Sequence, residues 1–210
     1  MILTPIDRDQ LAVRLKRFAS HLQDRRARTS LARIAATGST RARGARAEAH
    51  RLAAAGLARR LGIRIRSGSP RRSFGWDGRI MRAGTEAYVL LHEAAHWLLA
   101  DTRRRRACEF GLGPGPETGH CAAALRAILL TEMAREREEA MASLLGILWE
   151  AELRQPALAS FLDQNWLEGA DRPGAARYFE TVLTRLAAAG LVDLAGHPMI
   201  ARRPQRRSAP

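Results

Sequence analysis

The sequence predicts an α+β protein that is mostly helical, with a small antiparallel β-sheet of two or three strands packed on a helical core. Three observations support this prediction. Most of the chain carries apolar residues at helical spacing, and only residues 63–81 change to a strand-like alternation. The segment 88–100 is almost entirely apolar around His92, Glu93 and His96. With 210 residues, 46% of them hydrophobic, the chain is long enough to bury one core.

The first 60 residues form an arginine-rich helical region. The positions of Leu11, Leu15, Phe18 and Leu22 predict an amphipathic helix over residues 7–22. Glycine, serine and threonine then predict a loop. A second helix is expected over residues 45–61, and we interpret the arginines of this region as solvated faces.

The strands are expected between residues 63 and 81. Residues 63–66 alternate between apolar and charged, which is typical of a half-buried strand. Asp77-Gly78 lies between apolar residues, which favours a β-hairpin. Thr85 is a suitable N-cap for the next helix, which is expected to run to about Asp101.

The core region is expected to span residues 61–195. Helical patterns predict helices over residues 122–130, 132–153, 159–167 and 173–189. The four arginines Arg103–Arg106 indicate a solvated extension of the preceding helix. Glycine and proline exclude regular structure over residues 110–119. This loop is close enough in sequence to form a wall of a site on that helix, but it could equally be a plain connection. Residues 196–210 are expected to form a disordered basic tail.

The charge is strongly positive, at +14, and of 35 basic residues only Lys16 is a lysine. Such a surface attracts acidic proteins, RNA or the ribosome, but no known nucleic-acid-binding motif accompanies it. The cysteines Cys108 and Cys121 form no C-x-x-C pair, which is typical of a reducing compartment. No secretion signal and no run of roughly 20 apolar residues is present. We therefore expect a cytoplasmic protein without membrane partners.

The chain contains the pattern H-E-x-x-H at His92–His96. Two histidines four residues apart lie on one face of a helix, so both imidazoles can bind one metal ion. Glu93 lies within reach of a water on that metal and is the candidate general acid or base. The alternative is a helix whose histidines meet ordinary polar partners, but two histidines and a glutamate are costly to bury in an apolar helix without a metal.

A third ligand is needed. The extended pattern H-E-x-x-H-x-x-G-x-x-H is absent, because Leu99 and Thr102 stand where it needs glycine and histidine. A carboxylate on the 132–153 helix is the next option: Glu138 precedes an apolar stripe, and Glu139 precedes a face of small residues that would allow close packing. Periodicity leaves both open. Weaker candidates are Asp101 and His120.

A set of short motifs runs through the metal helix and beyond it. They are Arg79-Ile80, His92-Glu93, His96-Trp97, Ala100, Arg105-Arg106, Phe110-Gly111 and, further on, Leu167-Glu168-Gly169. In these motifs the chain resembles the elongation factor P hydroxylase family over roughly residues 79–180, without a gap as far as Phe110-Gly111. The first 60 residues match nothing in that family, and the segment between Phe110 and Glu139 is longer.

The resemblance implies a zincin-like fold and a hydroxylase that modifies a lysine on elongation factor P with a non-haem metal. It favours Glu139 as the third ligand beside His92 and His96. Two histidines and one carboxylate suit Fe(II), our favoured cofactor, and Zn(II) is the alternative. With zinc, the same residues make a metallopeptidase, which needs an edge strand such as the 74–81 hairpin to hold a peptide. A second alternative is a basic RNA- or ribosome-binding protein with a structural metal, whose fourth ligand would be His120 or Cys121.

Overall fold

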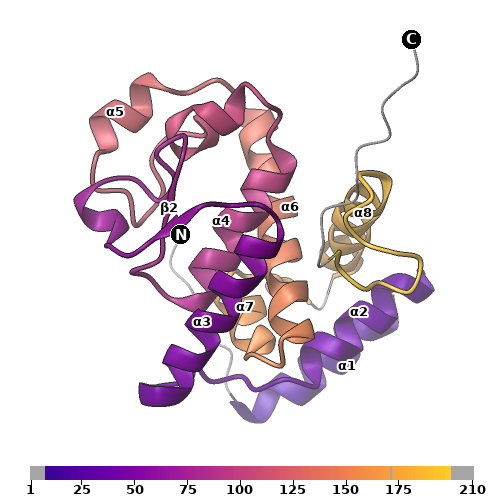
Figure 1. Ribbon diagram of the computed structural model, residues 1–210. Helices are drawn as coiled ribbons and strands as arrows, with labels where there is room; N and C mark the ends of the chain where they lie inside the picture. Colours follow the sequence, from indigo (N-terminus) through magenta and orange to yellow (C-terminus); the bar gives the residue numbers. More distant parts are fainter. Residues whose placement is uncertain (1–7, 171, 200–210) are drawn as a thin grey trace.

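Two helices, α4 (Ala87–Leu99) and α6 (Glu132–Glu152), pack against one another at the centre of the molecule (Figure 1). The hydrophobic core extends from them to residues of other helices. The structure is a computed structural model that describes residues 8–170 and 172–199. The other helices are α1 (Arg8–His21), α2 (Arg25–Ala35), α3 (Gly44–Arg60), α5 (Cys121–Arg126), α7 (Ala157–Asp163) and α8 (Pro173–Ala188). Strands β1 (Ile65–Arg66) and β2 (Met81–Arg82) and the short 3-10 turns η1 (Pro70–Arg72), η2 (Arg104–Arg106) and η3 (Cys108–Gly111) complete the fold.

Helices α4 and α6 approach one another closely because α6 presents small residues to α4. A Cβ atom placed on Gly146 would lie only 3.3 Å from the backbone nitrogen of His92. Ala142 is fully buried on the same side of α6. The small-residue face that the sequence predicts on α6 is therefore confirmed, and it sets the spacing of the two helices at the level of His92.

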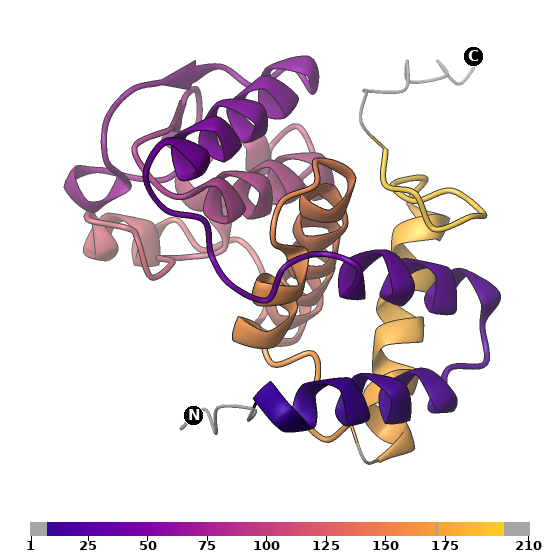
Figure 2. The same cartoon turned by 90° about the horizontal axis from the view of Figure 1, so that it is seen from below.

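The N-terminal helices pack on this core as part of one assembly. Helix α3 lies against α4 and buries Ala54, Leu57 and Ala58. Helices α1 and α2 lie beside α8, on the other side of α6 and α7 (Figure 2). The rings of Phe18 and Phe179 meet edge to face at 5.8 Å. The arginine-rich region up to residue 60 thus contributes to the hydrophobic core, although most of its arginines are at least partly exposed.

The predicted antiparallel sheet is wrong: β1 and β2 pair in parallel, with Ile65 opposite Met81. The Asp77-Gly78 turn does form, and the Asp77 carboxylate accepts the backbone N–H groups of residues 79 and 80. It closes only one antiparallel bridge, between Trp76 and Met81. The chain turns through residues 67–75 before that bridge, so β2 returns alongside β1 in the same direction.

The predicted helices are all present, with shifted ends. Helix α4 begins after Glu86, so Thr85 is not its N-cap. Helix α5 ends at Arg126, four residues early, and helix α2 had not been distinguished in the sequence. Of the expected tail, residues 196–199 pack on the core, where the indole of Trp149 donates to the carbonyl of Met199. Residues 200–210 lie outside the described residues. No described helix has the length and apolarity that crossing a bilayer requires.

Candidate metal centre

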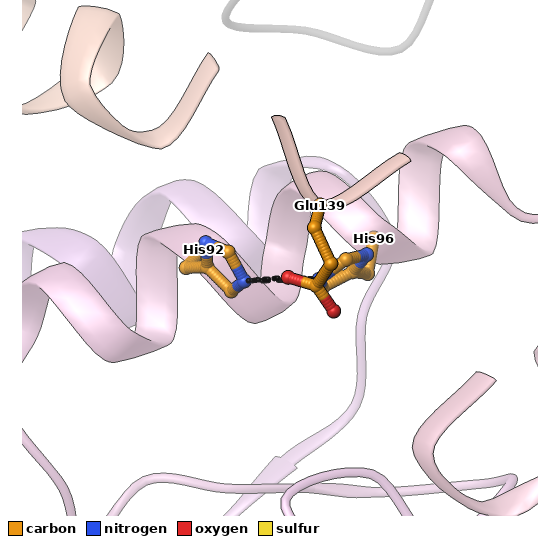
Figure 3. Close-up of side chains that lie close together, drawn as sticks. All are labelled: His92, His96 and Glu139. Atoms are coloured by element: carbon orange, nitrogen blue, oxygen red, sulfur yellow. Dashed lines mark hydrogen bonds and ion pairs between the residues drawn. The ribbon is translucent and has the colours of Figure 1, made fainter. Parts of the chain in front are cut away.

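Helices α4 and α6 bring His92, His96 and Glu139 together (Figure 3). The Nε2 atoms of the two histidines lie 2.9 Å apart. Oε2 of Glu139 lies 3.2 Å from Nε2 of His92 and 3.4 Å from Nε2 of His96. The His96 side chain is 3% exposed and that of Glu139 is 46% exposed, so the group is buried on one side and open on the other.

The donor set and its spacing fit a metal ion. Donor atoms about 2.1 Å from a common ion lie about 3.0 Å apart at right angles and about 3.4 Å apart in a tetrahedron. The three separations of 2.9, 3.2 and 3.4 Å fall close to this range. Three protein donors from two rigid helices therefore converge as the ligands of one divalent ion do, with room left for further ligands on the open side.

The neighbouring glutamate, Glu138, holds the back of the site. Its Oε1 lies 3.2 Å from Nδ1 of His96, and both its oxygens accept hydrogen bonds of 2.6 Å from Arg104. A carboxylate at Nδ1 favours the tautomer with the proton there, which leaves the Nε2 lone pair for a metal. The structure thus separates the two glutamates that periodicity left open, with Glu139 facing the histidine pair and Glu138 behind it.

Arg104 corrects a prediction. The run Arg103–Arg106 was expected to be a solvated helix extension, but Arg104 is 8% exposed. Helix α4 ends at Leu99, and the 3-10 turn η2 directs this one arginine inward, where its Nε also donates to the carbonyl of Phe110. The side chains of Arg103 and Arg106 are exposed to solvent, as predicted. Four identical residues give no sequence signal for which one is buried.

The candidate ligands shift one another's pKa values. Burial lowers the pKa of His96, but the contacts with Glu138 and Glu139 outweigh it and raise that pKa to about 10. Burial raises the pKa of Glu139, and the two histidines reverse this, so its net shift is downward. The imidazole of His96 thus keeps a proton beside the carboxylates of Glu138 and Glu139. A metal cation bound there would replace this proton and its positive charge.

Glu93 lies in the same cavity as the three candidate ligands. Burial raises the pKa of its carboxyl to about 8; the charge of His96 opposes this, and Glu109 and Glu139 add to it. No hydrogen bond of the Glu93 side chain occurs within the described residues. Its carboxyl is therefore available to a substrate or a water, as a general acid or base requires.

Glu109 is a cavity residue that sequence reasoning missed. It begins a left-handed stretch, with φ of 45° at Glu109 and 52° at Phe110, followed by Gly111 at 71°. This unusual turn directs its carboxylate to the backbone N–H of Gly75, at 2.8 Å, and to the Thr118 hydroxyl, at 2.8 Å. The only available signal was its place directly before the Phe-Gly motif.

The cavity over these residues has a volume of about 960 Å³. Residues 112–118 line it, so this loop forms a wall of the cavity and is not a plain connection. Residues 164–166, 168 and Tyr178 line it as well, and the rings of Trp166 and Tyr178 stack at 5.7 Å. Six glutamates and only two arginines line the cavity, so it is acidic in a chain whose net charge is +14.

The weaker ligand candidates lie elsewhere. Asp101 is exposed and accepts the backbone N–H of Arg104. His120 is exposed and contacts the carbonyl of Arg72, and its ring centroid lies 5.2 Å from that of Phe74 with the rings tilted by 52°. Cys121 is also exposed. Among the described residues, none of these three belongs to the group that can hold a metal.

None of the protein families, curated proteins or solved structures with which we compared the chain matches it. The functional argument therefore depends on the geometry of the site and on the motifs in the sequence.

Proposed function

We propose that this chain is a metal-dependent hydroxylase with a zincin-like catalytic core that modifies a lysine side chain on a protein, as the resemblance to elongation factor P hydroxylases implies. The observation that carries the proposal is the convergence of His92, His96 and Glu139 at one end of a cavity that also holds Glu93. Elongation factor P is the first candidate substrate.

The three ligands would hold one divalent cation, with Fe(II) favoured over Zn(II). An iron(II) ion on two histidines and one carboxylate keeps coordination positions open and supplies the redox chemistry of a hydroxylation. Within the protein, Glu138 and Arg104 orient His96. Glu93 holds or accepts a proton at its carboxyl, and the loop at residues 112–118 covers one side of the substrate.

The charge of the cavity supports a lysine substrate. The six glutamates that line the cavity attract a cationic side chain and disfavour an anionic one. The positive charge of the whole chain at the same time attracts an acidic partner protein. A basic exterior with an acidic cavity therefore suits a lysine displayed on an acidic protein.

The alternative of a zinc metallopeptidase uses the same ligands but has less support. A peptidase of this kind pairs its substrate with a free strand edge beside the metal. The segment expected to provide that edge is already paired, because Glu109 accepts from the N–H groups of Gly75 and Trp76 and donates its own N–H to the carbonyl of Trp76. An extended peptide would have to displace all three hydrogen bonds.

A basic RNA- or ribosome-binding protein with a structural metal is the second alternative. A structural site is closed by four protein ligands. His120 and Cys121 were the candidates for the fourth ligand, and neither lies in the group formed by His92, His96 and Glu139 among the described residues. The open side of the site favours catalysis.

The deciding experiment measures metal content by mass spectrometry on protein purified without oxygen and without a metal-affinity tag, beside His92→Ala. The iron-loaded protein is then incubated with elongation factor P, O₂ and a two-electron reductant, because hydroxylation inserts one oxygen atom and reduces the other to water. We expect near-stoichiometric iron, lost in the variant, and a mass gain of one oxygen on the substrate. Zinc with peptide cleavage that Glu93→Gln abolishes would replace this proposal with the peptidase.

A further inference from the structure

Glu109 carries a buried carboxylate that has no counter-ion among the described residues. The residue is 5% exposed, and its hydrogen-bond donors are all neutral: the backbone N–H groups of Gly75 and Trp76 and the hydroxyl of Thr118. In the part of the chain that the structure describes, no arginine, lysine or histidine forms an ion pair with it. Buried charges in proteins are normally paired.

Three other acidic groups near the metal centre do have partners. Glu138 is paired with Arg104, and Glu139 lies against the two imidazoles. Glu117, which lines the same cavity, forms an ion pair with Arg71. Glu109 therefore differs from these three glutamates in having no cation beside it among the described residues.

The carboxyl group of Glu93 lies close to that of Glu109. A Cβ atom on Gly75 would lie 3.2 Å from Oε2 of Glu109 and 3.5 Å from Oε2 of Glu93. The two carboxylate oxygens thus both lie close to Gly75 in the cavity wall. Because glycine has no side chain, the space beside them is not filled by this residue. Burial raises the pKa of Glu109, and its three hydrogen bonds and the charge of His96 offset this only in part.

We propose that Glu109 is a specificity-determining residue that binds the ammonium group of the substrate side chain, next to Glu93 in the cavity wall. This inference rests on the proposed function and names the residue that would recognise the charge of the lysine. A carboxylate offers about four acceptor positions, and the three neutral donors leave one for the substrate. A primary ammonium is compact and carries three donors, so it can satisfy Glu109 and Glu93 together.

The test uses the zinc-loaded full chain and two probes in ligand-observed NMR titrations. The probes are N-acetyl-lysine methylamide and its norleucine analogue, which has the same four side-chain carbons without the ammonium group. We expect the wild-type protein to prefer the lysine probe by about tenfold to a hundredfold, the contribution of a hydrogen bond to a charged group. In Glu109→Gln the preference should disappear while zinc content and melting temperature stay unchanged.

Glu117→Gln is the matched control, because it removes a charge from the same cavity but one that Arg71 already pairs. It should keep the preference. Glu109→Asp, which retains the charge, serves if the glutamine variant does not fold, and it should keep part of the preference. A lysine preference that survives in Glu109→Gln, or no preference in the wild type, would overturn the inference.

The zinc content of the same samples separates this inference from the proposed function. If the protein holds no metal, the hydroxylase proposal fails, and the titration is made on metal-free protein. A Glu109-dependent preference would then still identify a cation-binding cavity.

Discussion

The Nδ1 atom of His96 lies 3.2 Å from Oε1 of Glu138, and this contact assigns different positions to two adjacent glutamates. It occupies the ring nitrogen that faces away from His92, so the other nitrogen faces Glu139. Arg104 holds Glu138 in place with two hydrogen bonds. Glu138 and Arg104 thus support the candidate metal centre from behind without being part of it.

Substitution of the two glutamates should affect metal binding unequally. Glu139→Gln removes a ligand, so we expect stoichiometric binding of cobalt(II) to be lost. Glu138→Gln removes only the partner of His96, a change that typically weakens metal affinity about 10- to 100-fold. Cobalt(II) titration against a competing chelator measures both, with the exposed Glu136→Gln as the control. Equal losses in the two variants would mean that Glu138 is itself a ligand.

Removal of Arg104 should destabilise the fold more than removal of its neighbour. Arg104→Met leaves Glu138 buried without a cation, which costs about 3–5 kcal/mol in comparable pairs. The exposed Arg103→Met should change the free energy of unfolding by less than about 0.5 kcal/mol. Urea denaturation of both, and of the double variant Arg104→Met/Glu138→Met, provides the measurement. The double variant should recover most of the loss; if it is no more stable than Arg104→Met, the buried charge is not the cause.

Gly146 should control the distance between α4 and α6. Gly146→Ala gains about 1 kcal/mol of helix propensity but places a methyl group 3.3 Å from the His92 backbone nitrogen, so a small net change in stability is expected. Gly146→Val adds two more carbons at the same contact and should cost about 1–3 kcal/mol. Because the helices carry opposite halves of the metal site, the valine variant should also bind zinc more weakly. Unchanged zinc affinity in Gly146→Val would show that the site tolerates helix displacement.

Glu150 should make the stability of the protein depend on pH. Burial raises the pKa of this carboxyl to about 7, although Ser160 and Arg41 act to lower it. The folded state therefore keeps a proton that the unfolded state releases near pH 4.5, and stability is lost as the pH rises towards 7. The expected loss is on the order of 1–3 kcal/mol.

Glu150→Gln should flatten this dependence because glutamine does not ionise. Urea denaturation at pH 5.5 and pH 8, with a chelator present to keep the metal centre empty, compares the variant with wild type. Glu48→Gln is the control at an exposed position. An equal stability difference between the two pH values in wild type and Glu150→Gln would contradict the prediction.

The sequence by itself determined the helical character of the chain and the residues of the metal helix. The spacing of His92 and His96 follows from helix geometry, which is local and can be read from periodicity. The face of small residues on α6 likewise predicted close packing, and Gly146 confirms it. The sequence left open whether the Gly-Pro loop is a wall of the site or a plain connection, and the structure shows that residues 112–118 line the cavity.

Only the tertiary structure decided the features that depend on contacts between distant segments. Strand direction depends on how the chain returns after residue 66, and the short alternating pattern carries no information on that path. The burial of Arg104 among four arginines depends on where α4 ends and on the position of Glu138, 34 residues away. Glu109 enters the cavity through a left-handed turn that periodicity does not predict. The periodicity that predicts a helix involves residues that are near one another in the sequence. Ion pairs and the charge of the cavity depend instead on how distant segments pack together.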